Sequence, residues 1–149
     1  MKIIFVISII LFASLFVHAQ VKPVVKPTPT LLLSEASVKS SPAYAEVLLR
    51  KTELAAELEN LLLEYTEDYP RVRELRFEVG LLQKDLVKLL GVSDASKLSL
   101  ALGKLMVRKA ELAADVWSLQ RQYADEHPDV KRAKRKVEIF EQAIKEILP

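Results

Sequence analysis

The same short motif occurs twice in this chain, 58 residues apart. Residues 64–72 read EYTEDYPRV and residues 122–130 read QYADEHPDV, with Tyr, an acidic pair, a ring, Pro and Val in matching places. Placing 50–90 on 108–148 without a gap gives twelve identities in 41 positions. A repeat of this period indicates that a supersecondary unit has been duplicated. The chain should therefore contain the same fold element twice.

Each copy carries two apolar stripes, one on either side of the motif. Their members are spaced by three and four residues, the a/d pattern of helices that pack at a shallow angle. The stripes before the motif are Tyr44, Val47, Lys51, Leu54, Leu58, Leu61 and Tyr65, and Leu102, Leu105, Lys109, Leu112, Val116, Leu119 and Tyr123. Those after it are Val72, Leu75, Val79, Leu82, Leu86 and Leu89, and Val130, Ala133, Val137, Phe140, Ile144 and Ile147. Lys51 and Lys109 depart from the pattern at the same place, and we expect their stems to lie along the seam with the ammonium groups in water.

The motif itself predicts a bend between two helices. Pro70 and Pro128 would break a helix interior but are favoured at a first helical position. The residue before a proline is kept out of the helical region, so Tyr69 and His127 should end the connection. The acidic residues just before each proline lie near the next helix N-terminus, where the helix dipole favours negative charge. Each copy is therefore predicted to be a helical hairpin.

The two copies are joined by GVSDAS, residues 91–96, in which Ser93 or Asp94 is expected to cap the next helix. The predicted helices span 43–67, 70–90, 94–125 and 128–148. The fold class is all-α, two tandem duplicated antiparallel helical hairpins. A short connection favours an up-down-up-down four-helix bundle. The alternative is a pair of extended coiled-coil hairpins that bury their seams against another chain.

Charge offers a test of the closed bundle. Residues 43–69 hold seven acidic and two basic side chains, whereas 70–90 hold three and five, and 128–149 hold four and six. In a closed bundle the acidic first helix would neighbour both basic helices. Exposed ion pairs contribute only about 0–1 kcal/mol each, so they would affect which helices lie side by side but would not supply most of the free energy of folding.

The N-terminus has the features of a secretory signal peptide. Lys2 precedes a fifteen-residue apolar run, IIFVISIILFASLFV, and the small residues Val17 and Ala19 place cleavage between Ala19 and Gln20. The run is shorter than the roughly 20 residues that a spanning helix needs, so the alternative of a retained membrane anchor is less favoured. We expect a secreted or periplasmic protein, in contact with a membrane only if the leader is uncleaved.

The predicted organisation follows from these segments. Pro23, Pro27 and Pro29 favour an extended tether after the leader. The ranges are 1–19 for the signal peptide, 20–41 for a Pro/Ser-rich linker, 42–90 for the first hairpin repeat, 91–96 for the turn and 97–149 for the second hairpin repeat.

The composition offers little for catalysis or for cofactors. There is no Cys, which excludes disulfides and thiolate metal sites, and His127 is the only histidine after the leader. Paired carboxylates such as Glu53 and Glu57 are expected on a solvated face. Removal of Lys2 leaves 22 − 1 = 21 basic residues against 20 acidic ones, a balance unlike that of a nucleic-acid-binding protein. We therefore predict no enzyme, no cofactor, no metal site and no nucleic-acid partner.

Two sets of residues are candidates for binding. The hinge tips offer side chains that either close the hairpin end or dock a protein partner: Tyr65, Tyr69, Pro70, Tyr123, His127 and Pro128. The run KRAKRK offers a basic face for an anionic glycan or lipid surface, although a solvated helix face paired with the acidic helix is the simpler interpretation: Lys131, Arg132, Lys134, Arg135 and Lys136.

The segments LLLEYTEDYPRVRELRFEVGLLQKDL and LQRQYADEHPDVKRAKRKVEIFEQAI resemble the extracytoplasmic coiled-coil hairpins of polysaccharide chain-length determinant and exopolysaccharide export proteins. In these hairpins the motif often reads Tyr, a polar stretch, His-Pro and Val, and a heptad pattern of apolar residues follows it. The resemblance covers about forty residues per copy and implies the hairpin element alone. Family members add transmembrane helices and a membrane-proximal α/β domain that this sequence does not show, so regulation of glycan length is not expected to carry over.

The sequence therefore predicts an exported, non-enzymatic protein that works through coiled-coil contacts, as an adaptor or a self-assembling envelope component. The alternative is a periplasmic chaperone or stress-binding protein whose apolar helical surface holds unfolded clients.

Overall fold

The structure, a computed structural model, describes residues 34–149. The expected signal peptide and most of the expected linker lie outside the described residues. Over 34–149 the chain is all-α, as predicted. Its helices are α1 (Glu35–Lys39), α2 (Pro42–Leu62), α3 (Pro70–Leu90), α4 (Leu100–Gln120) and α5 (Pro128–Ile147), with a 3₁₀ turn η1 (Ala95–Lys97) before α4.

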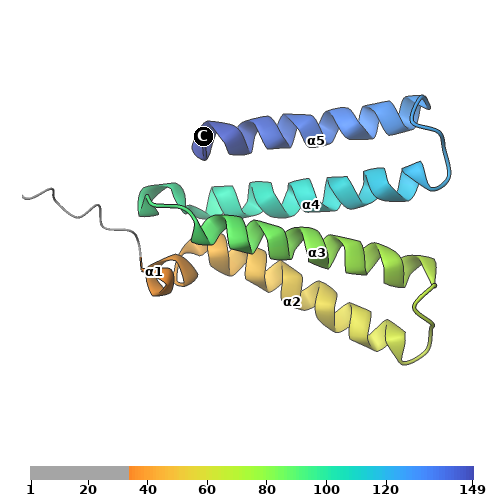
Figure 1. The fold of residues 1–149 in the computed structure, drawn as a ribbon, viewed down its shortest axis with the longest axis horizontal. Helices are drawn as coiled ribbons and strands as arrows, with labels where there is room; N and C mark the ends of the chain where they lie inside the picture. The colour runs from red at the N-terminus through yellow and green to blue at the C-terminus, as the bar shows by residue number, and fades with distance from the viewer. Residues whose placement is uncertain (1–33) are drawn as a thin grey trace, which may run out of the picture. The chain divides into compact units, whose positions relative to one another are not determined.

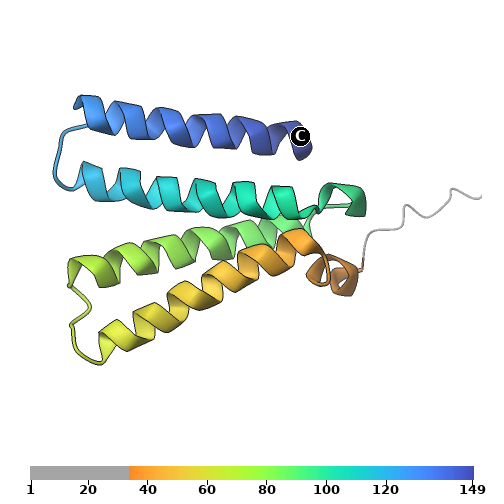
Figure 2. The same cartoon turned by 180° about the vertical axis from the view of Figure 1, so that it is seen from behind.

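The long helices form two antiparallel hairpins, α2–α3 and α4–α5, whose connections lie at the same end (Figure 1). The hairpins pack against each other because α4 contacts both α2 and α3. Helix α5 packs on α4 and makes at most marginal contact with any other helix. The view from behind shows the same order, with α5 at the outer edge (Figure 2).

This order corrects the charge argument made for a closed bundle. The acidic helix α2 does neighbour α3, and Arg71 on α3 holds Glu57 on α2 at 2.9 Å. However, α2 lies beside α4 and not beside α5. The basic residues of α5 therefore have no acidic helix to face. The described chain is a bundle with one open edge.

The two bends repeat in atomic detail. Five backbone hydrogen bonds of the first recur in the second at the 58-residue offset. For example, Tyr65 N–H donates to the carbonyl of Leu61 at 2.8 Å, and Tyr123 N–H donates to that of Leu119 at 2.9 Å. The first arms were predicted to reach 67 and 125 but end five residues earlier, because the chain uses the polar segment before each proline to reverse. Pro70 and Pro128 begin the second arms, as predicted.

The helix starts repeat as well. The hydroxyl of Ser41 accepts the N–H of Tyr44 at the start of α2, and the hydroxyl of Ser99, 58 residues later, accepts the N–H of Leu102 at the start of α4. The predicted start of the third helix at 94 is therefore wrong. Asp94 caps η1 instead, and α4 begins six residues later.

The core follows the predicted stripes. All their members are buried or half-buried except Tyr65 and Tyr123. The stripe of α3 is almost completely buried, but that of α5 is mostly half-buried, since only α4 covers it. Within the range expected as a linker, α1 packs on α2 and α3 and buries Val38.

Candidate functional site

Each hinge tip holds a pair of stacked rings. Tyr65 stacks on Tyr69 with ring centroids 4.2 Å apart, and Tyr123 stacks on His127 at 4.3 Å. Because the i,i+4 spacing recurs with the bend, both tips present the same arrangement at the same end of the two hairpins (Figure 1). The stacks are partly exposed, as are the prolines that follow them.

His127 has a structural role in its tip. It is the N-cap residue of α5, and its Nδ1 accepts the N–H of Asp129 at 3.2 Å. Tyr69 occupies the same place before α3 without a side-chain cap bond. The tips therefore close the hairpin ends, and their use in docking a partner stays a prediction.

The basic run on α5 is largely paired within its own hairpin. Lys131 lies 2.9 Å from Glu126 and Lys134 lies 3.0 Å from Asp125. Arg132 pairs with Asp129, and Arg135 pairs with Glu138 at 2.9 Å. The side chains of these groups are between 39% and 85% exposed, so each pair contributes little to stability. This pairing favours a solvated helix face, but the carboxylates come from the second bend and α5, not from the acidic helix.

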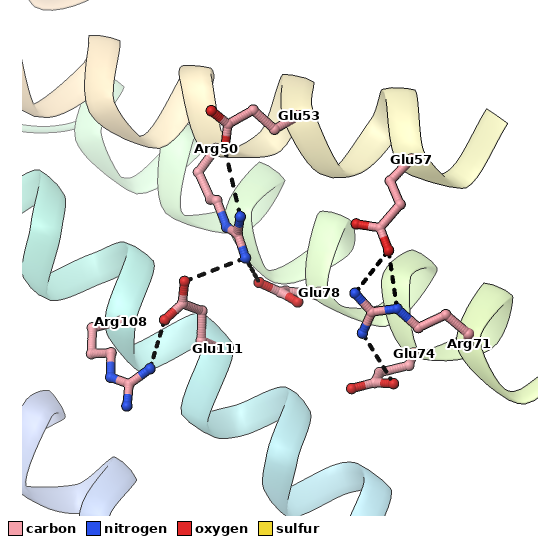
Figure 3. Close-up of polar contacts among 8 residues, drawn as sticks. All are labelled: Arg50, Glu53, Glu57, Arg71, Glu74, Glu78, Arg108 and Glu111. Atoms are coloured by element: carbon pink, nitrogen blue, oxygen red, sulfur yellow. Dashed lines mark hydrogen bonds and ion pairs between the residues drawn. The ribbon is translucent and has the colours of Figure 1, made fainter. Parts of the chain in front are cut away.

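An ion-pair relay crosses the contact between the two hairpins (Figure 3). Arg50 on α2 lies 3.5 Å from Glu53 on its own helix and 3.4 Å from Glu111 on α4. Glu111 in turn pairs with Arg108 at 2.8 Å. Arg50 and Arg108 are equivalent in the repeat, as are Glu53 and Glu111. The relay therefore alternates sign through two copies of one Arg-x-x-Glu element.

Glu78 on α3 lies beneath this relay. Its side chain is only 6% exposed and lies 3.7 Å from Arg50, beyond hydrogen-bonding distance, so the buried Oε1 has no hydrogen-bond partner. Burial raises the pKa of Glu78. The positive charge of Arg50 lowers this pKa, and the negative charge of Glu111 raises it further. The burial of Glu78 could not be predicted from the sequence, because nothing in the helical period distinguishes it from an exposed glutamate.

The charge balance around Glu78 gives a pH-dependent prediction. Because the folded-state pKa is raised, ionisation of Glu78 opposes folding; this penalty is absent below about pH 4.5 and develops as pH rises through the folded pKa. Arg50→Met should therefore lower the free energy of unfolding at pH 7 by about 2 kcal/mol, less than the 3–5 kcal/mol of a fully buried pair. Glu78→Gln should raise it.

Urea denaturation at pH 7 and pH 4 checks both changes. The cost of Arg50→Met should shrink at pH 4, and Glu78→Gln should rescue most of it at pH 7. An Arg50→Met cost that is equal at both pH values, with no rescue, would mean that Arg50 acts through packing.

Lys109 corrects a prediction about the seam. Its ammonium donates to both carboxylate oxygens of Asp85 on α3 at 2.8 Å, where the sequence predicted an ammonium group in water. The side chains are 18% and 7% exposed, so this is a largely buried ion pair. It joins α3 to α4, and the sequence showed only that a lysine stood in a stripe.

A second face of α4, which the stripes did not predict, carries the contact with the first hairpin. It comprises small and apolar residues, here termed the α4 stripe: Gly103, Met106, Ala110, Ala114 and Trp117. A Cβ on Gly103 would lie 2.8 Å from the Cβ of Glu46 and 2.9 Å from the carbonyl oxygen of Ala43, so α2 and α4 cross in close contact there. Trp117 stacks on Phe77 of α3 at 5.3 Å.

Two apolar surfaces remain open. A groove of about 330 Å³ runs between α3, α4 and α5, lined by Phe77, Ala113, Val116, Trp117 and Val137 and by polar residues at its rim. The outer side of α2 exposes Leu48 and Leu49, and Leu63 is exposed just after the helix ends; the last two are 58% and 85% exposed. Neither surface brings nucleophile, acid and base together. Both suit contact with another apolar surface.

No helix among the described residues is long and apolar enough to cross a membrane. Within 34–149, no three His, Cys, Asp or Glu side chains are grouped to hold a metal ion. Comparison of the chain with family models, curated proteins and solved structures found no match.

Proposed function

We propose that this chain is an exported, non-enzymatic helical-hairpin protein that acts through helix-face contacts, as an adaptor or a self-assembling envelope component. The observation that carries the proposal is the outer side of α2, where Leu48 and Leu49 are exposed on the helix and Leu63 is exposed just after it ends. Exposed apolar patches of this kind mark protein interaction surfaces. The open edge at α5 supports the same function.

Export rests on the N-terminal leader. A basic residue, a fifteen-residue apolar run and small residues before Gln20 are the parts of a cleavable signal peptide. N-terminal sequencing of the protein recovered from the producing cell tests this directly. A first residue of Gln20 supports cleavage, whereas an intact Met1 would leave the chain tethered by its leader.

The rival function is a chaperone that holds unfolded clients. The groove beside Phe77 and Trp117 favours it, because it is apolar and open. Its volume of about 330 Å³ accommodates a few side chains rather than a long unfolded segment. The adaptor or self-assembling role is therefore preferred.

Sedimentation velocity combined with a client-aggregation assay separates the two functions. We expect the purified protein to leave the aggregation of a heat-denatured model client unchanged at equimolar ratio, with bovine serum albumin as a control. Suppression of aggregation together with comigration of the client would overturn the proposal in favour of the chaperone.

A further inference from the structure

The contact between the two hairpins has two complementary sides. One is the α4 stripe. The other, termed the docking face, lies on the first hairpin and consists of Ala43, Arg50, Phe77, Glu78 and Leu81. Ala43 meets Gly103, Arg50 pairs with Glu111, and Phe77 stacks on Trp117, so these residues define how α4 sits on α2 and α3.

The repeat places an equivalent docking face on the second hairpin. Adding 58 to each position gives Ala101, Arg108, Arg135, Lys136 and Ile139. All five are exposed, and Ile139 is 53% exposed although its counterpart Leu81 packs against the core. A groove of about 470 Å³ follows this side of α4 and α5, and its lining includes Leu112, Ala133 and Lys136 together with Glu74 of α3. The second hairpin thus has an equivalent face whose five positions are left exposed by residues 34–149.

The repeat also places an equivalent of the α4 stripe on α2. Subtracting 58 gives Ala45, Leu48, Thr52, Ala56 and Glu59. All five are exposed, while their counterparts on α4 are buried or half-buried. This α2 stripe forms part of the outer side of α2. Within residues 34–149, the docking face of the second hairpin and the α2 stripe of the first hairpin are therefore both exposed.

We propose that the occupant of both faces is a second copy of this chain, docked head to tail. The α2 stripe of one copy lies on the second hairpin of the next, as α4 lies on the first hairpin within one chain. This inference rests on the proposed function and identifies the binding partner as a second copy of the chain. The interface is heterologous, since it joins two different surfaces, so it continues into a ring or an open filament.

Charge supports this pairing. The interhairpin ion pair of Arg50 with Glu111 becomes a pair of Arg108 with Glu53 of the next copy, so the relay in Figure 3 continues across the interface with alternating sign. Lys136 in place of Glu78 adds a cation beside that glutamate. The aromatic stack of Phe77 on Trp117 is replaced by Arg135 opposite Glu59 of the next copy, an oppositely charged pair.

Two differences make the contact between copies weaker than the contact within one chain. Ala45 stands in place of Gly103, where a Cβ would lie 2.8 Å from a side-chain carbon and 2.9 Å from a backbone oxygen of the facing helix, so the helices must lie farther apart between copies than within one chain. Ala143 stands in place of Asp85, so the buried pair with lysine is not reproduced. The association should therefore be concentration-dependent.

Complementary blocking variants test the geometry. Leu48→Glu blocks the α2 stripe and leaves the docking face, whereas Ile139→Glu blocks the docking face and leaves the stripe. By sedimentation velocity, the wild type should grow in mass with concentration and each variant should remain monomeric. An equimolar mixture of the two variants should form a dimer that does not extend. Val87→Glu changes an exposed apolar position on α3 that belongs to neither face, and it should behave as wild type.

A charge exchange tests the register. Glu59→Arg and Arg135→Glu should each raise the concentration for half-association about tenfold, and the double variant should restore it. Circular dichroism confirms that each variant is folded. A wild type that stays monomeric at the highest soluble concentration overturns the inference, and so does a variant mixture without dimer. Either result leaves the proposed function standing if the client assay is negative, because an adaptor can use the same faces for another protein.

Discussion

Lys109→Met is expected to lower the free energy of unfolding by about 3–5 kcal/mol, the largest effect of any single substitution proposed for this chain. The ammonium of Lys109 is the only cation within ion-pair distance of Asp85 among the described residues, and it contacts both carboxylate oxygens at 2.8 Å. Its removal leaves a nearly buried carboxylate without a counter-charge between α3 and α4. Urea denaturation at pH 7 measures the loss.

Two variants distinguish an unpaired charge from lost packing. Lys109→Met combined with Asp85→Leu should recover to within about 1 kcal/mol of wild type or exceed it, because a buried ion pair replaced by apolar side chains is often neutral or stabilising. Lys51→Met changes the equivalent seam position, where no carboxylate of the described residues lies within ion-pair distance, and should cost little. Equal losses for Lys51→Met and Lys109→Met would contradict the role of the Asp85 pair.

Gly103→Leu is expected to destabilise the protein by about 3 kcal/mol, because it forces α2 and α4 apart at a point where they are in close contact. The first added carbon alone would lie 2.8 Å from the Cβ of Glu46 and within about 3.0 Å of the backbone of Ala43. A backbone neighbour cannot rotate away as a side chain can. Differential scanning calorimetry should show a lower melting temperature.

Gly80→Ala is the matched control. Gly80 also lies within a long helix, but an added Cβ meets nothing within 4 Å. It should gain stability by about 0.5–1 kcal/mol, since alanine is the better helix former. If Gly103→Ala stabilised the protein as much as Gly80→Ala, the close crossing of α2 and α4 would be wrong.

The bends show why part of the fold could be predicted from local chemistry. Proline at a first helical position and the extended residue before it act within a few residues, so Pro70 and Pro128 were placed correctly without knowledge of the packing. The first residues of the helices were harder to predict from the sequence. Asp94 and Ser99 are both good caps, and only the position of η1 decides which of them begins α4.

The candidate site was harder to predict. The hinge rings were identified from the repeat, but their stacking depends on how far each bend turns. Ala56 and Ala114 are aligned in the repeat, yet Ala56 is exposed on α2 and Ala114 is buried on α4. Glu78 and Glu53 are also alike in sequence, and only one of them lies under another helix.

What the sequence determined by itself is therefore the repeated unit: its period, its proline-initiated bends and the apolar seam that closes each hairpin. These depend on interactions between residues near one another or related by a fixed helical spacing. Only the tertiary structure decided that the second hairpin packs on the first through α4, that Lys109 pairs with Asp85, and that α5 lies at an open edge. The physical reason is that two copies of one hairpin offer equivalent faces, and the choice between them depends on close approach at Gly103 and on charges that come together only after the helices have packed.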